Sequence, residues 1–227
     1  MDFEADPFIE EISRNELRDT FGLAICAIFH QPKPIPFVDF YHQLIQQLKA
    51  NFTDDEKQSV YLFPIDFLHI TISLVYNFKY GAPESPEECL QYWKERFKQL
   101  KQASKNQPII LTIDTINLSK AAGYFQYKDE ANRIEDIRRL IREICIPLEG
   151  QSPVTIPNIV HTTFLRFAKK PQDPVKFEEK FHRICQEVFA KTNGILFEID
   201  EICLAFDSHP FLHVKCDEFH VFDTMKC

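Results

Sequence analysis

The chain has 227 residues, a length that suits one large domain or two small lobes. Hydrophobic residues make up 44% of it, with 22 phenylalanines, enough to fill a core. The net charge of −8 argues against a protein that binds long polyanions over a broad basic surface. A nucleic-acid ligand, if there is one, is therefore expected to be a small nucleotide or an RNA end held in a local pocket.

The N-terminal residues and the cysteines indicate the compartment. Residues 1–20 are rich in Asp and Glu and lack the basic and apolar segments of a signal peptide. No apolar run reaches the roughly 18 residues of a membrane span. The seven cysteines include no Cys-x-x-Cys pair, as expected for reduced thiols. We expect a cytoplasmic or nuclear protein that contacts no membrane and acts as a monomer.

In the first half of the chain, hydrophobic periodicity predicts an alternation of helices and strands. Apolar residues three or four apart indicate the main helix, and three prolines stiffen the loop before it. The expected order is an N-terminal arm (1–20) that is loose or forms a short helix (9–17), a strand (23–29), a proline loop (31–36), a helix (37–48), a surface loop (53–57) and two strands (60–63 and 67–76).

The second half opens with a clear helix start. Ser85 is a favourable N-cap, Pro86 suits the first helical position, and Glu88 stands three residues after the cap. No linker or low-complexity tract follows, so we treat residues 1–227 as a single domain. The expected order is that helix (86–100), two strands (109–119 and 123–128), a helix (134–148), a strand (157–168), a helix (174–188) and two strands (196–206 and 211–215).

Two of the predicted strands carry the same short motif, His-x-Thr. In the strand over 67–76, even positions are apolar, while His69 and Thr71 share the opposite face. In the strand over 157–168, His161 and Thr163 share one face in the same way. A single His-x-Thr carries little information, but two copies on two predicted strands indicate a function.

The two motifs occupy equivalent places in an internal repeat. Residues 113–118 (IDTINL) match residues 199–204 (IDEICL), and the order strand, helix, motif strand, helix, strand, strand occurs twice. A duplicated unit of this kind packs as two similar lobes related by a pseudo-twofold axis. We therefore expect an α+β fold in which two antiparallel-rich sheets face a central cleft, with helices on the outer faces and the two motifs opposite each other.

Two facing imidazoles suit a reaction that removes one proton and delivers another, because histidine titrates near neutral pH. Nearby threonine hydroxyls can donate hydrogen bonds to the oxygens of an anion. Phosphodiester cleavage needs this set of groups. Zinc is a competing use of histidine, but no further His or Cys stands at ligand spacing to either motif. We expect no metal and no cofactor.

In the motifs at 69–72 (HITI) and 161–164 (HTTF), and in the duplicated α+β frame around them, the chain resembles the two-histidine (2H) phosphoesterase superfamily. This superfamily includes the LigT-like RNA cyclic phosphodiesterases. The resemblance extends over roughly residues 20–220. It implies a bilobal fold with the active cleft between the lobes, and metal-independent cleavage of cyclic or terminal phosphodiesters.

Carried over to this sequence, the resemblance makes His69 and His161 the general acid and base. It makes Thr71 and Thr163 the ligands of the phosphate oxygens. Arg166 resembles the arginine found five residues after the second histidine in LigT-like proteins, and would add a bidentate cation. Strict alternation places Arg166 on the face opposite His161, so this role requires a bulge or a twist; a surface or inter-strand arginine is the alternative.

Three aromatic residues, Tyr76, Tyr124 and Phe125, are candidates for stacking a base in the cleft, with core packing as the alternative for each. The hypothesis we prefer is hydrolysis of the 2′,3′-cyclic phosphate of a nucleotide or RNA end, with His161 as base and His69 as acid. Pseudosymmetry permits the reverse assignment. Two alternatives remain: cleavage of linear 2′–5′ or 3′–5′ linkages, and a non-catalytic nucleotide-binding module.

Overall fold

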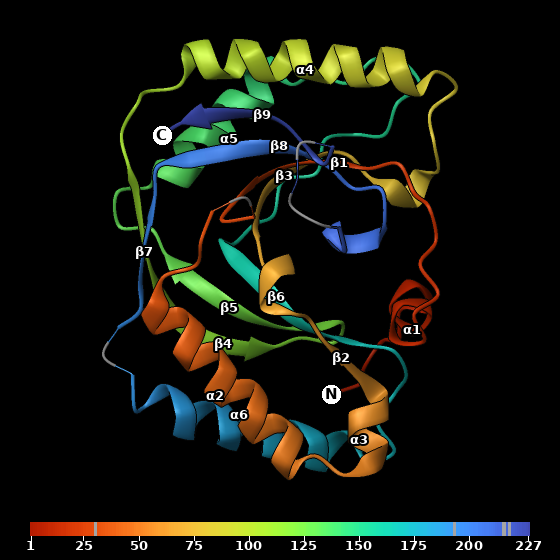
Figure 1. Cartoon of the computed structure of the whole chain (residues 1–227), viewed down its shortest axis with the longest axis vertical. Helices are drawn as coiled ribbons and strands as arrows, with labels where there is room; N and C mark the ends of the chain where they lie inside the picture. Colours follow the sequence, from red (N-terminus) through yellow and green to blue (C-terminus); the bar gives the residue numbers. More distant parts are fainter. Residues whose placement is uncertain (30, 193, 215–216, 218) are drawn as a thin grey trace.

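A computed structural model describes residues 1–29, 31–192, 194–214, 217 and 219–227. Helices and strands alternate through most of the chain (Figure 1). The α-helices are α1 (Pro7–Ser13), α2 (Ile35–Asn51), α3 (Asp54–Ser59), α4 (Pro86–Ala103), α5 (Arg133–Ile144) and α6 (Pro174–Phe189), and short 3₁₀ helices are η1 (Ile65–Phe67), η2 (Phe78–Tyr80) and η3 (Pro210–Leu212). The strands are β1 (Leu23–Ala27), β2 (Val60–Leu62), β3 (Ile70–Tyr76), β4 (Ile109–Leu118), β5 (Ala122–Lys128), β6 (His161–Phe167), β7 (Leu196–Ile199), β8 (Glu201–Phe206) and β9 (Val221–Lys226).

The strands form two antiparallel sheets with equivalent strand orders. One sheet has the order β3-β1-β8-β9, and the other has the order β2-β6-β5-β4-β7. The strands β1 and β5, which open the two repeats, lie next to the motif strands β3 and β6. The strands β8 and β4, which contain residues 202–204 and 116–118 of the repeated segment, stand one place further. This arrangement confirms the predicted α+β fold with two antiparallel sheets.

Helices cover the outer sides of the two sheets. In Figure 1, α4 and α5 lie above the sheet that contains β1, while α2 and α6 lie below the sheet that contains β5. The buried face of α4 includes Trp93, Phe97 and Leu100, each at most 1% exposed. Burial of such large side chains stabilises each lobe by roughly 1.5–3 kcal/mol per residue. Between the lobes, β3 of one sheet contacts β6 of the other.

The N-terminal arm differs from the prediction, because it packs against the core. Phe3 is fully buried, and Ile9 and Ile12 of α1 are at most 3% exposed. The backbone N–H groups of Glu4 and Asp6 donate to carbonyls of the second lobe, at 2.8 and 2.9 Å. The acidic residues that suggested a loose arm occupy the exposed side of this segment, while its few apolar residues hold it in place.

Two further boundaries differ from the predictions. The expected loop at 53–57 is largely helix α3, because Thr53 and Glu56 form a capping box at its start. The expected strand at 211–215 is in part η3, and the final strand is β9; Lys215 lies outside the described residues. Phe211 and Leu212 have φ angles of 64° and 52°, a left-handed conformation that a strand excludes.

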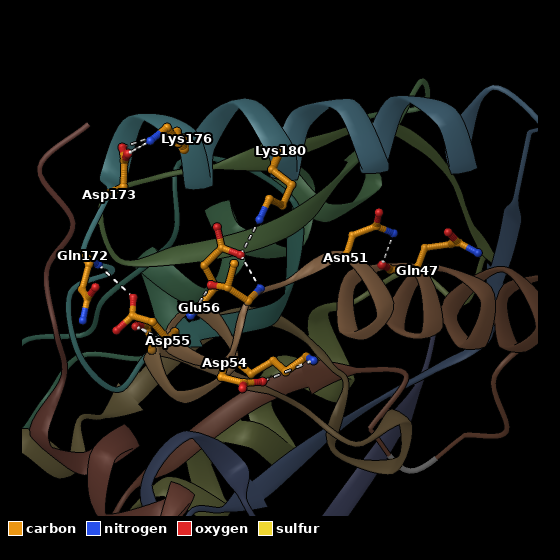
Figure 2. A network of polar contacts seen from close by, with 12 residues as sticks. Gln47, Asn51, Asp54, Asp55, Glu56, Gln172, Asp173, Lys176 and Lys180 are labelled. Carbon is orange, nitrogen blue, oxygen red and sulfur yellow. Dashed lines mark hydrogen bonds and ion pairs between the residues drawn. The ribbon is translucent and has the colours of Figure 1, made fainter.

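An ion pair ties α3 to α6. Oε2 of Glu56 accepts hydrogen bonds from the backbone N–H of Thr53 at 2.7 Å and from Nζ of Lys180 at 2.6 Å. Figure 2 shows Lys180 reaching Glu56 from α6, and Asp55 bound by the backbone N–H of Gln172. The side chains of Glu56 and Lys180 are only 9% and 22% exposed. Because α3 leads directly into β2, and β2 pairs with β6, this pair supports the outer side of a motif strand.

We predict that Glu56→Ala lowers the free energy of unfolding by about 2–4 kcal/mol, because it leaves the partly buried ammonium of Lys180 without its partner and removes the capping box of α3. Urea unfolding measures the change. Lys57→Ala is the matched control: its pair with Asp54 is 3.8 Å long and exposed, so its removal should cost less than about 0.5 kcal/mol. Equal losses in the two variants would contradict a structural role for the buried pair.

Candidate active site

A bulge in β6 decides which of its side chains share a face. In the pairing of β5 with β6, Phe164 has no partner, and the alternation shifts by one residue at that point. Phe164 and Leu165 are therefore both buried in succession. After this bulge Arg166 returns to the same face as His161. The bulge that a role of Arg166 beside His161 requires is therefore present. Gly123 faces the bulge, and a Cβ there would lie 3.2 Å from Cβ of Leu165.

The first motif strand has a bulge at the equivalent position. In the pairing of β1 with β3, Ile72 has no partner, and Ile72 and Ser73 are both buried. The residue that then returns to the motif face is Leu74, which is the counterpart of Arg166. The two halves of the site are thus alike in their histidine and threonine, but only the half built on β6 carries a cation at this place.

The two motifs line one pocket. It has a volume of about 280 Å³, and its wall includes His69, Thr71, His161, Thr163 and Arg166. His69 comes just before β3, which starts three residues later than predicted, and His161 is the first residue of β6. The structure therefore brings together, from two separate sheets, the five residues selected as catalytic and phosphate-binding candidates.

Each motif histidine is held by the backbone two residues before it. Nδ1 of His69 donates to the carbonyl of Phe67 at 2.9 Å, and Nδ1 of His161 donates to the carbonyl of Ile159 at 3.4 Å. Because a carbonyl only accepts, the hydrogen of the neutral ring is on Nδ1 in both residues. In both rings Nε2 keeps its lone pair, and it makes no hydrogen bond within the described part of the chain. Each Nε2 can therefore accept a proton from a ligand.

The surroundings of the histidines favour their neutral forms. Burial lowers the pKa of His69 to about 4, against a smaller opposing effect of its bond to Phe67, and the charges of Lys33, His161 and Arg166 lower it further. Burial likewise lowers the pKa of His161. The charged groups that lower the pKa of His69 or of His161 are cationic, although the protein as a whole is acidic. An anion bound between the rings would raise both pKa values.

The guanidinium of Arg166 forms no ion pair with a described residue; the carboxylate of Asp6 acts on it only from a longer distance. The guanidinium makes no hydrogen bond with any described residue, and its Nε is buried without a partner. Burial lowers the pKa of Arg166 to about 10, against a smaller effect of Asp6 that raises it, so the group remains charged at neutral pH. The centroid of the Phe211 ring lies 4.1 Å from the guanidinium carbon. A ligand that carries oxygens and negative charge would stabilise this desolvated cation through charge-assisted hydrogen bonds.

No protein-family model and no curated protein sequence matches the chain. Solved structures do resemble it: Escherichia coli LigT complexed with 3′-AMP has a TM-score of 0.51 and 12% identity, over 92% of this chain and 96% of that one. The fold is that of LigT. Kluyveromyces marxianus Usb1 with uridine monophosphate has a TM-score of 0.50 and 11% identity, over 81% and 92%. A conserved protein of unknown function from Agrobacterium tumefaciens, ATU0111, reaches 0.60 with 10% identity, over 98% and 90%. The resemblance inferred from the two motifs is confirmed at the level of the fold.

The aromatic residues of this LigT fold are arranged differently from the prediction. Phe125 is fully buried and stacks on Phe164, with centroids 4.5 Å apart, and Tyr76 is also buried. Both belong to the core, which was the alternative interpretation of each residue. Tyr124 lies beside the ring of His161, with centroids 5.6 Å apart, but the pocket wall does not include it.

Sequence reasoning missed the aromatic residues that do line the pocket, notably Phe67 and Phe211. Phe67 carried a usable signal, because it precedes His69 by two residues and so continues the motif face. Phe211 carried none, because the chain reaches the pocket there through a left-handed turn. In this turn Asp207 Oδ1 accepts the backbone N–H of Leu212 at 2.6 Å.

Two searches of the described residues gave negative results. Across the ranges that the structure describes, no group of three or more His, Cys, Asp or Glu side chains is placed to hold a metal ion. Across the same ranges, every helix is too short or too polar to span a bilayer.

We predict that Arg166→Met weakens the binding of inorganic sulfate by roughly 10–100-fold, because charge-assisted hydrogen bonds to a guanidinium contribute about 1.5–3 kcal/mol. The same variant should leave the unliganded protein within about 1 kcal/mol of the native stability, since it removes an unpaired desolvated charge. Thermal unfolding with and without sulfate measures both effects. The control is Arg183→Met, which removes an exposed arginine paired with Glu187. Sulfate stabilisation that survives in Arg166→Met would refute the anion site.

Proposed function

We propose that this protein is a metal-independent phosphodiesterase that hydrolyses the 2′,3′-cyclic phosphate of a nucleotide or an RNA end. The observation that carries the proposal is the composition of one pocket wall. It combines two histidines with unprotonated Nε2 atoms, two threonine hydroxyls and an arginine whose buried Nε makes no hydrogen bond. These groups match the needs of a cyclic phosphate: a base, an acid and donors for its non-bridging oxygens.

The reaction divides the work between the two histidines. Nε2 of His161 takes a proton from water, and the water oxygen attacks phosphorus. Nε2 of His69 gives a proton to the ribose oxygen as the bond between that oxygen and phosphorus breaks. Thr71, Thr163 and Arg166 hold the non-bridging oxygens, on which negative charge builds up. The near-symmetry of the pocket permits the opposite assignment of the histidines.

A proton balance fits a scheme in which one histidine is the acid and the other the base, in either assignment. Both histidines are neutral in the free pocket at pH 7, because burial lowers their pKa values. The cyclic phosphate brings one negative charge, which raises the pKa of each ring and favours the uptake of one proton. The bound state then has one neutral and one protonated histidine, as acid–base catalysis requires.

Two structural neighbours give independent support. The E. coli LigT structure holds 3′-AMP, and the K. marxianus Usb1 structure holds uridine monophosphate. Each ligand is a nucleotide with a single phosphate, the class of molecule that suits a pocket of about 280 Å³ in the present protein. We infer a nucleotide or an RNA end as the substrate.

We predict that His69→Gln and His161→Gln each lower kcat by at least about 100-fold on 2′,3′-cyclic nucleotides or cyclic-ended RNA, because each removes one proton transfer. The native enzyme should keep its activity with a metal chelator present. His42→Gln, on the exposed side of α2, is the control and should match the native rate. Product analysis by chromatography or mass spectrometry measures turnover.

The same substrate panel separates the alternatives. Short RNAs with 2′–5′ or 3′–5′ linkages that yield cyclic ends would favour a transesterase over the proposed hydrolase. Saturable nucleotide binding without turnover of any substrate would favour a non-catalytic module. Activity that is unchanged in both histidine variants would contradict the proposed chemistry altogether.

A further inference from the structure

The pocket extends past the histidines along β3. Its wall includes Phe67, just before His69, and also Asn77 and Lys79, which follow the end of β3. A strand of this length spans roughly 20 Å. The pocket therefore has one end beside Phe67 and a second end beside Asn77 and Lys79, with His69 nearer to the first.

The cations of the pocket divide between a central and a remote position. Arg166 lowers the pKa of both His69 and His161, so it lies close to the centre. Lys79 follows the end of β3 that is opposite to His69, which places it further from that ring. Both cations lie against the ring of Phe211, Arg166 at 4.1 Å and Lys79 at 5.7 Å from its centroid. The aromatic ring thus connects the phosphate site at the centre with a second positive charge.

The remote end has donors that the structure leaves available. Lys79 is the middle residue of η2, and Asn77 fixes this turn by accepting the backbone N–H of Lys79 at 3.0 Å with its Oδ1. The Nδ2 amide of Asn77 makes no hydrogen bond to a described residue. The side chain of Lys79 is 51% exposed, so its ammonium can move toward a ligand.

Two acidic residues lie near this end and must be weighed. Oδ2 of Asp6 is 3.5 Å from Nζ of Lys79, and Oδ1 of Asp6 accepts the backbone N–H of Phe8 at the start of α1. Burial raises the pKa of Asp207 to about 8, so this carboxyl is mostly protonated at neutral pH. One carboxylate thus faces two cations, Lys79 and Arg166, and an excess positive charge remains.

We propose that the Lys79 end of the pocket binds a second phosphate group of the substrate. The preferred substrate is then a nucleotide that carries a further phosphate besides the cyclic one, as in a 5′-phosphorylated nucleoside 2′,3′-cyclic phosphate or the terminal nucleotide of an RNA chain. Lys79 and Asn77 donate to this phosphate. The inference rests on the proposed function, which puts the cyclic phosphate between His69 and His161.

Binding without turnover gives the most direct test. The probes are adenosine 3′-monophosphate, which has one phosphate, and adenosine 3′,5′-bisphosphate, which has two; calorimetry measures both dissociation constants. We expect the native protein to prefer the bisphosphate by roughly 10-fold, because a charge-assisted hydrogen bond strengthens binding and solvent exposure of Lys79 reduces this effect. Lys79→Met should abolish this preference and leave the affinity for the monophosphate unchanged.

The chain provides a matched control and a variant with the opposite effect. Lys120 also pairs with a carboxylate of the N-terminal segment, 3.9 Å from Glu4, but the pocket wall does not include it. Lys120→Met should therefore keep the native preference. Asp6→Asn retains an N-cap for α1 and removes the competing carboxylate, so it should increase the preference for the bisphosphate.

The outcomes separate this inference from the proposed function. Equal affinity of the native protein for the two probes would overturn the second phosphate site, and so would a preference that persists in Lys79→Met. A Lys79-dependent preference for the bisphosphate in a protein that turns over no cyclic phosphate would support the site and overturn the proposed reaction. Turnover of cyclic phosphates with no Lys79-dependent preference would support the proposed reaction and overturn the second phosphate site.

Discussion

A β-bulge three residues after each motif histidine determines which side chains face the pocket. Regular alternation would send Arg166 away from His161, and would turn Leu74 away from His69. The bulges at Ile72 and Phe164 shift the alternation by one residue, so that each strand presents a histidine, a threonine and one further side chain to the same side. The pseudo-twofold arrangement of the two sheets then brings both sets to one pocket.

The same arrangement is symmetric in its proton-transfer groups and asymmetric in its charge. Leu74 and Arg166 occupy corresponding places, so the pocket wall has a guanidinium on one side and an apolar side chain on the other. Low-dielectric surroundings strengthen the interaction of an anion with this guanidinium, since burial lowers the pKa of Arg166 as it does that of both histidines. A chain with a net charge of −8 thereby keeps a cationic pocket, which fits a compact anionic ligand better than a long polyanion.

The sequence predicted the parts of this site that depend on local periodicity. His69, Thr71, His161 and Thr163 follow from alternation on two strands, and the repeat predicted two similar lobes. Long-range packing decided the rest. Phe125 and Tyr76 are aromatic residues next to or on a motif strand, yet they fill the core, while Phe67 and Phe211 line the pocket.

Two of the errors have one physical origin: a few residues outweighed the composition of their segment. Phe3, Ile9 and Ile12 dock an otherwise acidic arm. Buried Asp207 holds a left-handed turn at Phe211 where apolar residues suggested a strand. Side chains that accept backbone N–H groups across a turn, or that dock through a handful of contacts, leave no periodic signal in the sequence.

The central claim is that both histidines face a single anion site. NMR titration of the two imidazoles, with and without inorganic sulfate, tests it directly. In the free protein the pKa of His69 should be near 4, and sulfate should raise the pKa of His69 and of His161 together, because a bound anion stabilises both protonated rings. By linkage, sulfate affinity should then increase as the pH falls from 7 toward 5. A response of only one histidine, or of neither, at saturating sulfate would contradict the account.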